Sequence, residues 1–130
     1  MSGENVDKLR RAYDAFSRGD FDTAIEIAHS EIEFVRAGGQ SRVTGVQAFR
    51  AWMEPDAIED ARIEPLEFRT NGNKVLVRQR TRGRGARSGT ELADETWAVW
   101  TLDANGLATH LEAFLAHQGN EALDAAGLGE

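Results

Sequence analysis

Two carboxylates and an amide could form a chemical centre in this chain. Glu64, Gln79 and Asp94 lie on three consecutive segments whose residues alternate as in β-strands, and the alternation puts all three side chains on one face. Facing side chains on neighbouring strands lie within about 5 to 8 Å of one another. Two carboxylates that share an apolar site raise the pKa of one, which yields a general base near neutral pH. Asp94 and Glu64 are therefore the candidate catalytic residues.

A structural interpretation of the same cluster stays open. Arg36 is expected inward on a nearby strand, where it would neutralise the carboxylates, and buried carboxylates are usually paired in this way. In the catalytic interpretation Arg36 or Tyr13 would stabilise developing oxyanion charge, and Gln79 would orient the base or a water molecule.

Large apolar side chains are expected on the same face. Tyr13, Trp52, Trp100 and Leu111 occupy inward positions of the predicted helices and strands. Together with Arg36 they would contact a ligand, with the three aromatic rings forming a wall against a planar molecule. The alternative is that these rings only fill the core.

Several classes of partner are disfavoured by composition. The net charge of −7 argues against nucleic acid and anionic membranes, because a polyanion is repelled by most of the surface. His29, His110 and His117 lack metal-ligand spacing, and the chain has no cysteine. No apolar run is long enough for a signal peptide or a membrane span. We expect a cytoplasmic protein without metal or cofactor.

The residues from Lys74 to Ala116 are predicted to form three antiparallel strands. Asn105-Gly106 predicts a two-residue type I′ turn, which sets Trp100 opposite Leu111. The preceding turn lies within residues 83–89, and matching opposite charges sets Arg78 opposite Glu95 and Gln79 opposite Asp94. A further strand over residues 61–70 is expected to point Glu64, Leu66 and Phe68 inward.

Helices are expected before and after these strands, in one domain of residues 1–130. Apolar spacing and caps predict two N-terminal helices separated at Gly19, a short strand over Glu31 to Arg36, a third helix from Thr44 to Met53, and a C-terminal helix over Asn120 to Ala126.

This order of elements resembles the nuclear transport factor 2-like (NTF2-like) superfamily. The segments "FSRGDFDTAIEIAHSEIEF", "VTGVQAFRAWM", "VWTLDANGLATHLEAFL" and "EALDAAGL" are similar to its SnoaL-like branch in content and order. The resemblance implies an α+β cone in which the N-terminal helices pack on the concave face of a strongly bent, mostly antiparallel sheet. The cavity between them is then the binding site.

The catalytic residues of the superfamily do not transfer as a set. An acid of the cyclases and epoxide hydrolases corresponds to Ala113, and an Arg-x-Asp pair of the hydrolases corresponds to Gln79 and Thr81. Where the steroid isomerase-like members carry an aspartate base, this chain has Arg36, although Tyr13 matches their tyrosine.

Two functions therefore remain open. The first is binding of a small hydrophobic ligand in an apolar conical pocket without catalysis, which the missing acids favour. The second is a cofactor-independent isomerase, cyclase or hydrolase that acts by proton transfer on a small hydrophobic carbonyl or epoxide compound.

The outer sheet face is expected to form a homodimer interface. Ile63, Leu76, Trp97, Val99 and Phe114 are predicted to point outward, away from the helices, and such a patch is too apolar for a monomer. A second copy packed by a two-fold axis would cover it.

Overall fold

The structure, a computed structural model, describes residues 2–35, 42–53 and 58–129. Its helical elements are α1 (Ser2–Ser17), α2 (Phe21–Ala24), η1 (Ile25–Ile27), α3 (Val46–Met53), η2 (Ala116–Gln118) and α4 (Gly119–Ala125). Its strands are β1 (Ala28–Val35), β2 (Arg42–Thr44), β3 (Ile58–Asn71), β4 (Lys74–Gly85), β5 (Glu91–Leu102) and β6 (Ala108–Phe114). The predicted α+β class is confirmed.

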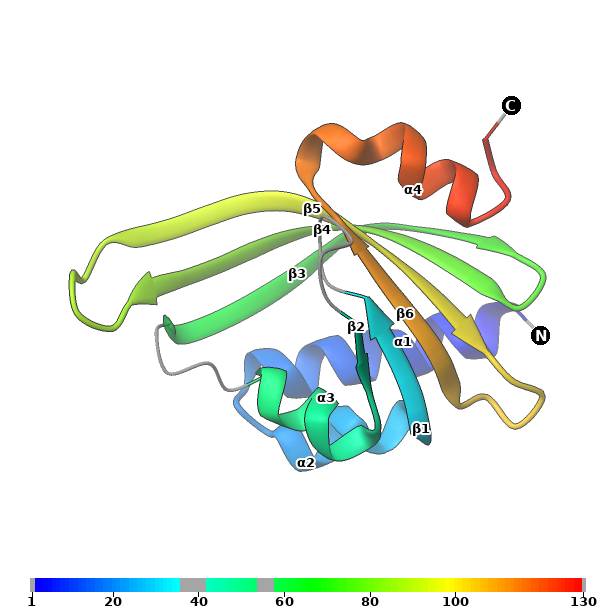
Figure 1. The fold of residues 1–130 in the computed structure, drawn as a ribbon, viewed down its shortest axis with the longest axis horizontal. Helices are drawn as coiled ribbons and strands as arrows, with labels where there is room; N and C mark the ends of the chain where they lie inside the picture. The colour runs from blue at the N-terminus through cyan, green and yellow to red at the C-terminus, as the bar shows by residue number, and fades with distance from the viewer. Residues whose placement is uncertain (1, 36–41, 54–57, 130) are drawn as a thin grey trace.

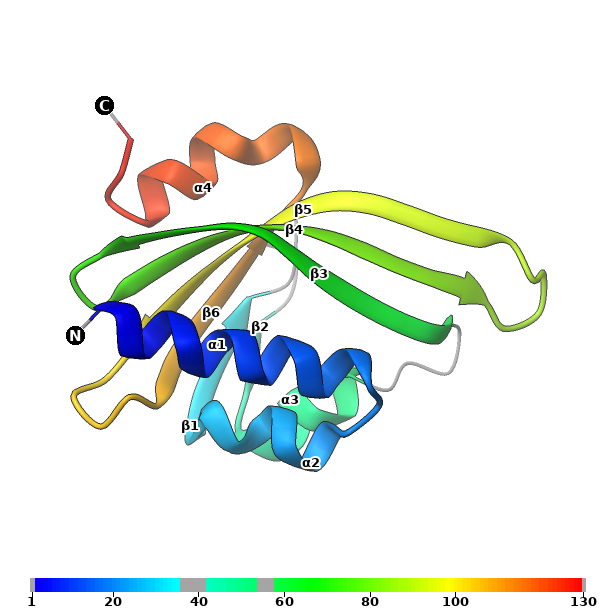
Figure 2. The same ribbon diagram turned by 180° about the vertical axis from the view of Figure 1, so that it is seen from behind.

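The strands form one bent sheet in the order β2-β1-β6-β5-β4-β3. All neighbours are antiparallel except β1 and β6, which are parallel. Helices α1, α2 and α3 lie under one face of this sheet, and α4 lies on the other (Figure 1). From behind, α1 runs along the edge strand β3 (Figure 2), where the hydroxyl of Ser17 bonds the backbone N–H and carbonyl of Ile63. No helix among the described residues is long and apolar enough to cross a membrane.

Helix α1 carries its apolar residues on one side. Leu9, Tyr13 and Phe16 recur at helical spacing and are buried against the concave sheet face. The helix ends before Gly19, whose φ of 79° lies in the left-handed region that stops a helix. Asp20 then caps α2 by accepting a bond from the backbone N–H of Thr23. The two predicted N-terminal helices are present, although the second is only one turn of α-helix followed by a 3₁₀ turn.

The predicted pairing of β5 with β6 is confirmed over most of its length, with Trp100 opposite Leu111. The turn type is wrong, because Gly106 has a positive φ of 80° and Asn105 does not. Asp103 explains the difference: its carboxylate accepts bonds from the backbone N–H groups of Asn105 and Leu107. This side chain favours a longer loop that ends in a left-handed glycine.

The pairing of β4 with β5 differs from the prediction by two residues. Gln79 lies opposite Thr96 and Thr81 opposite Asp94, while Arg80 instead of Arg78 lies opposite Glu95. Charge matching did not resolve this register because Arg78 bonds Glu95 diagonally at 3.0 Å. A shift of two leaves each side chain on its predicted face, because side chains alternate with a period of two.

The predicted orientation of the first half of β3 is wrong. Pro65 lies opposite Gln79 and Glu67 opposite Arg78, so Leu66 is an extra residue in a β-bulge. A proline has no N–H for the ladder and is tolerated at such a position on an edge strand. Before the bulge the sidedness is therefore reversed: Ile63 packs inward and Glu64 points outward. After the bulge Phe68 packs inward, as predicted.

The convex face is partly covered within the chain itself. Leu76, Val99 and Phe114 are buried together with Ala122 and Ala126 of the C-terminal segment. The last carbonyls of this segment are held by Lys74, which donates to the Ala125 oxygen at 2.8 Å, and by Asn71, which donates to the Ala126 oxygen.

The premise of the predicted homodimer interface is therefore wrong. The α4 segment covers much of the outward apolar patch, and Trp97 packs its ring on Gly119. Ile63, the fifth residue assigned to that patch, faces the opposite side of the sheet.

Candidate functional site

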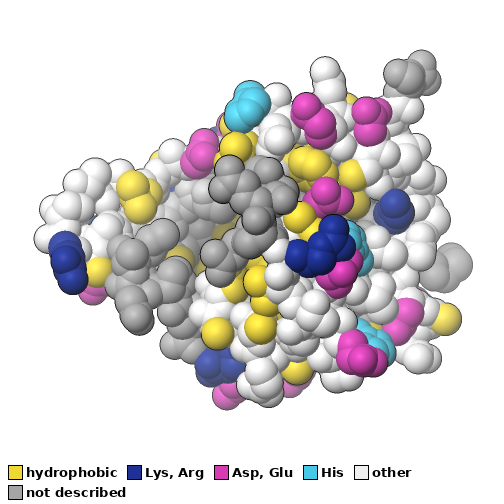
Figure 3. Space-filling view, viewed as in Figure 1, with side chains coloured by type: hydrophobic (Ala, Val, Ile, Leu, Met, Phe, Trp, Pro, Cys, Tyr) yellow, Lys and Arg dark blue, Asp and Glu magenta, His cyan; other side chains and the backbone are white. Residues whose placement is uncertain are grey.

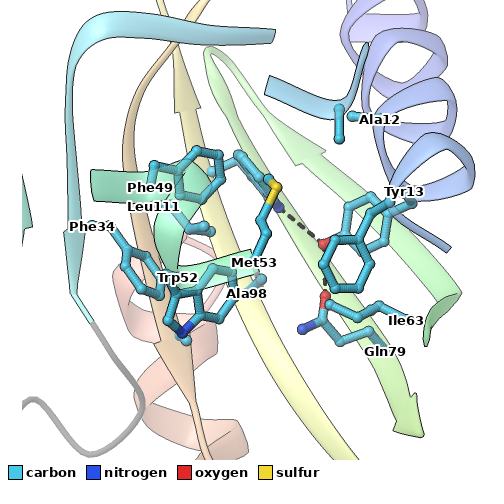
Figure 4. A pocket seen from close by; sticks show the side chains of 14 residues that line it. Ala12, Tyr13, Phe34, Phe49, Trp52, Met53, Ile63, Gln79, Ala98 and Leu111 are labelled. Atoms are coloured by element: carbon cyan, nitrogen blue, oxygen red, sulfur yellow. Dashed lines mark hydrogen bonds between the residues drawn. The ribbon is translucent and has the colours of Figure 1, made fainter. Parts of the chain in front are cut away.

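A small cavity lies between the concave sheet face and the helices. It has a volume of about 50 Å³, and α1, α2, α3, β1, β3, β4, β5 and β6 all contribute to its wall. Most of its lining is aliphatic or aromatic, as the close view shows (Figure 4). The lining side chains are those of Ala12, Tyr13, Phe16, Ala24, Phe34, Phe49, Trp52, Met53, Ile63, Gln79, Ala98, Trp100, Leu111 and Ala113.

The aromatic side chains form a connected set around this inner cavity. Phe49 of α3 stacks on Trp52 with ring centroids 6.0 Å apart, and its edge meets Trp100 at 6.4 Å. Phe34 of β1 packs against Trp52 at 4.5 Å. The helical spacing of Phe49, Trp52 and Met53 directs α3 toward the sheet, so the ring set follows from the amphipathic pattern of that helix.

One hydrogen-bond network supplies the polar groups of the cavity wall. The indole N–H of Trp100 donates to Tyr13 Oη at 3.0 Å, and Tyr13 donates to Gln79 Oε1 at 2.6 Å. Gln79 Nε2 donates to Thr96 Oγ1 at 3.2 Å. An indole N–H can only donate, so the Tyr13 proton is directed to Gln79, and this fixes the amide nitrogen toward Thr96. The network joins α1, β4 and β5 through neutral groups.

Tyr13 is buried beneath the helix, with 6% of its surface exposed. Burial raises the pKa of its hydroxyl well above the ordinary value, and the hydrogen bond from Trp100 opposes that rise only in part. Tyr13 therefore stays protonated in the physiological range. It can donate or accept a hydrogen bond, but it cannot serve as a general base.

No carboxylate is found among the described residues that line the inner cavity. Among the described residues that line it, Tyr13 is the single ionisable side chain. A proton-transfer mechanism needs a base within hydrogen-bond reach of the reacting atom, directly or through one water. The inner cavity offers shape, apolar surface and neutral hydrogen-bonding groups.

A second, outer cavity of about 220 Å³ adjoins the first. Four residues line both cavities: Phe16, Trp52, Met53 and Ile63. Beyond them the wall combines Ala61, Gly83, Leu92 and Ala93 with four polar or charged residues: Arg62 of β3, Thr81 and Arg82 of β4, and Asp94 of β5. Among the described residues, the charged side chains of the two linings thus all belong to the outer cavity.

Five of the residues predicted to bind a ligand line the inner cavity. They are Tyr13, Trp52, Gln79, Trp100 and Leu111. Their predicted position is confirmed, and their role in binding stays a prediction. Arg36, the sixth, lies outside the described residues.

The predicted cluster of Glu64, Gln79 and Asp94 does not form. The bulge in β3 turns Glu64 to the outer face, where its carboxylate lies 3.7 Å from Arg80 and is 61% exposed. Asp94 is exposed and lines the outer cavity, on the side where it was expected. The side-chain partners of Gln79 are Tyr13 and Thr96.

Ile63 was missed because its orientation depends on the bulge. Pro65, which lies at that irregularity, is the sequence signal that could have indicated it. The bond between Gln79 and Tyr13 joins residues 66 positions apart, and no local pattern predicts it.

The fold occurs in other solved structures. SalBIII, an epoxide hydrolase/cyclase-like enzyme in pyran ring formation in the polyether salinomycin, superposes with a TM-score of 0.79 at 18% identity over 87% of this chain and 91% of that one. An NTF2-like protein of unknown function from Burkholderia pseudomallei K96243 gives 0.76 at 20% identity, covering 94% and 96%. RV0760c from Mycobacterium tuberculosis, in complex with estradiol-17beta-hemisuccinate, gives 0.72 at 9% identity, covering 83% and 90%.

These identities are low, so the structural likeness shows the fold alone. No curated protein matches the chain. The family model of the SnoaL-like domain matches residues 9–111, which span α1 to β6 and include most of the residues that line the inner cavity. The chain therefore belongs to the SnoaL-like family, and it shares its fold with the NTF2-like protein described above.

Proposed function

We propose that this protein binds a small hydrophobic molecule between its helices and the concave sheet face without transforming it. The observation that carries the proposal is the lining of the inner cavity, in which aromatic and aliphatic side chains surround one neutral network of Tyr13, Gln79 and Trp100. Apolar walls with a few placed polar groups are typical of small-molecule sites.

The size of the cavities bears on the ligand. A water molecule needs on the order of 10 to 15 Å³ of such volume, so the inner cavity of about 50 Å³ holds only a few waters. A molecule with fused rings must also occupy the outer cavity of about 220 Å³. Trp52 and Met53 lie where the two cavities meet, so their rotamers control the passage between them.

The structural neighbours support a ligand of this class. One is described as acting in pyran ring formation in a polyether, and another is in complex with a steroid ester. We extend to this chain only the class of ligand, a hydrophobic ring compound.

The test is titration with N-phenyl-1-naphthylamine, an uncharged dye whose fluorescence rises in apolar surroundings. We expect saturable binding and quenching of the tryptophan emission, because Trp52 and Trp100 line the site. Ala113→Leu should fill the cavity and weaken binding, whereas Ala125→Leu on α4 serves as the matched control. Equal affinities in these two variants would place the dye elsewhere.

A second candidate function is proton transfer by Asp94 on a small hydrophobic carbonyl or epoxide compound. It is favoured by one observation, the place of Asp94 in the outer cavity next to the inner one. Asp94→Asn keeps the shape of the side chain and removes the base. Turnover of a carbonyl or epoxide substrate that survives this change would exclude Asp94 from the mechanism.

We also propose that two copies associate through the part of the convex face that α4 leaves uncovered. Arg78, Arg80 and Glu95 lie there with alternating sign, so a two-fold axis can set this patch against itself. We place the protein in the cytoplasm, because a chain without cysteine suits a reducing compartment. Sedimentation as a monomer at micromolar concentration would contradict this interface.

A further inference from the structure

The outward side chains of β3 and β4 follow a rule of opposite charge that breaks at one place. Glu67 lies opposite Arg78, and Glu64 lies opposite Arg80. At the far end Glu59 lies opposite Arg84, which bonds Asp60. Between these pairs Arg62 lies opposite Arg82. Like charges directly opposite one another destabilise a sheet, so this position needs a reason.

Neither arginine is neutralised within the described part of the chain. Arg78 reaches Glu95 at 3.0 Å and Arg80 reaches Glu64 at 3.7 Å, whereas Arg62 and Arg82 form no ion pair with the described residues. Both are exposed. The two arginines thus lie directly opposite one another on the ladder, and the described residues supply neither with a counter-ion. A local rule broken without a compensating contact is characteristic of functional positions.

The pair lies next to the proposed ligand site. Arg62 and Arg82 line the outer cavity, which shares Phe16, Trp52, Met53 and Ile63 with the inner one. The same two arginines line a groove of about 450 Å³ between α1 and β3, together with Arg10, Arg80, Asp14 and Glu64. Both acids of this groove have partners, since Asp14 pairs with Arg18 and Glu64 with Arg80. Because β3 is the edge strand, the far end of a molecule whose rings fill the cavities would reach this cationic rim around the edge of the sheet.

We propose that Arg62 and Arg82 bind the anionic group of an amphipathic ligand, a carboxylate, sulfonate or phosphate attached to the hydrophobic body. The inference rests on the proposed binding function and specifies its ligand. A guanidinium group donates two parallel hydrogen bonds to such an anion, and two opposed guanidinium groups surround it. The bound anion removes the repulsion between the two arginines. An anion site therefore also explains why Arg62 lies opposite Arg82.

Two features limit the attraction to this place. The chain carries a net charge of −7, so its surface as a whole repels anions, and the positive rim is a local exception. Asp94 lines the same outer cavity and opposes an anion there. Removing the Asp94 charge should therefore strengthen anion binding, which is the opposite of the effect of removing an arginine.

A matched pair of dyes tests the proposal. 8-Anilino-1-naphthalenesulfonate and N-phenyl-1-naphthylamine share their ring system and differ by the sulfonate. We expect the ratio of their affinities to fall about tenfold in Arg62→Gln and in Arg82→Gln, the size typical of losing one charge-assisted contact. Arg87→Gln is the control, because Arg87 is exposed in the adjoining turn and forms no ion pair with described residues. Asp94→Asn should raise the ratio.

The outcomes separate this inference from the proposed function. If both dyes bind and the ratio is the same in all variants, the arginine site is wrong and the binding function stands. If neither dye binds the folded protein, both are wrong. If the ratio falls in Arg62→Gln and Arg82→Gln, holds in Arg87→Gln and decreases in 1 M salt for the unaltered protein, the site is supported.

Discussion

The two faces of the sheet carry the same kinds of residue and use them differently. On the concave face, polar side chains such as Gln79 are buried in a neutral hydrogen-bond network, and space is left between sheet and helices. On the convex face, arginines and glutamates pair in water, and α4 packs closely on Leu76 and Val99. The described lining of the inner cavity carries no charged side chain, and an unpaired buried charge would be costly there.

In the space-filling view, acidic and basic side chains lie beside one another without large blocks of one sign, and hydrophobic side chains gather near the middle of that face (Figure 3). The comparison teaches that both faces pack a core and that the concave face also leaves a cavity. Each prediction below alters one face and uses the other as its reference.

The largest effects are expected from removing core volume on either face. Phe49→Ala, on the concave side, should lower the free energy of unfolding by about 3 to 5 kcal/mol, and Leu76→Ala, on the convex side, by about 2 to 5 kcal/mol. Both residues are almost fully buried. Denaturant unfolding measures the losses.

Dye binding distinguishes the same two variants. Phe49→Ala enlarges the cavity and should change the affinity for N-phenyl-1-naphthylamine, whereas Leu76→Ala should leave it unchanged under conditions where both variants are folded. A change in affinity in Leu76→Ala would mean that the faces are coupled. Phe49→Leu, a smaller truncation, applies if the alanine variant does not fold.

A smaller loss of stability is expected from changes in the hydrogen-bond network of Tyr13, Gln79 and Trp100. Tyr13→Phe removes the acceptor of the Trp100 N–H and the donor to Gln79, so two buried polar groups lose a partner. We expect a loss of about 1 to 3 kcal/mol. Gln79→Met combined with Tyr13→Phe should cost less than the sum of the single changes, since the groups left unpaired overlap. Additive losses would show that the network does not act as a unit.

Alkaline titration probes the same network without mutation. Tyr13 is the single tyrosine of the chain, so tyrosinate absorbance reports on this residue alone. Burial raises its folded-state pKa above the unfolded value near 10, hence the folded state holds more protons above that pH and stability falls as pH rises through it.

We therefore expect no tyrosinate signal at pH 10 to 11 in the folded protein, and a sudden signal when the chain unfolds. Tyr13→Phe should show a shallower loss of stability in this range than the unaltered chain. A gradual titration centred near pH 10, with the fold intact, would contradict the buried network.

The smallest effect is expected in the charged ladder of the convex face. Arg78→Gln removes contacts to Glu67 and Glu95 whose side chains are 49% and 47% exposed. Exposed ion pairs contribute about 0 to 1 kcal/mol, so the stability change should be small and should vanish in high salt. A loss that persists in 1 M salt would indicate that Arg78 contributes through packing instead of charge.

The alternation of apolar and polar residues predicted correctly which side chains of β4, β5 and β6 face the helices. Val77, Trp100 and Leu111 are inward as expected, and this held even though the β4–β5 register was wrong by two. Sidedness has a period of two and survives such a shift. The amphipathic spacing of α1 and α3 was equally informative, and it placed Tyr13 and Trp52 at the cavity.

Two outcomes depended on contacts between distant segments. The bulge at Pro65 reversed the first half of β3 and carried Glu64 away from Asp94, because the pairing of β3 with β4 absorbs one extra residue. The docking of α4 on Leu76 and Phe114 covered the face reserved for a second copy. Local pattern determined the faces of α1, α3, β4, β5 and β6. Only the tertiary structure decided which elements meet across them, because pairing and docking are settled by packing between residues far apart in the chain.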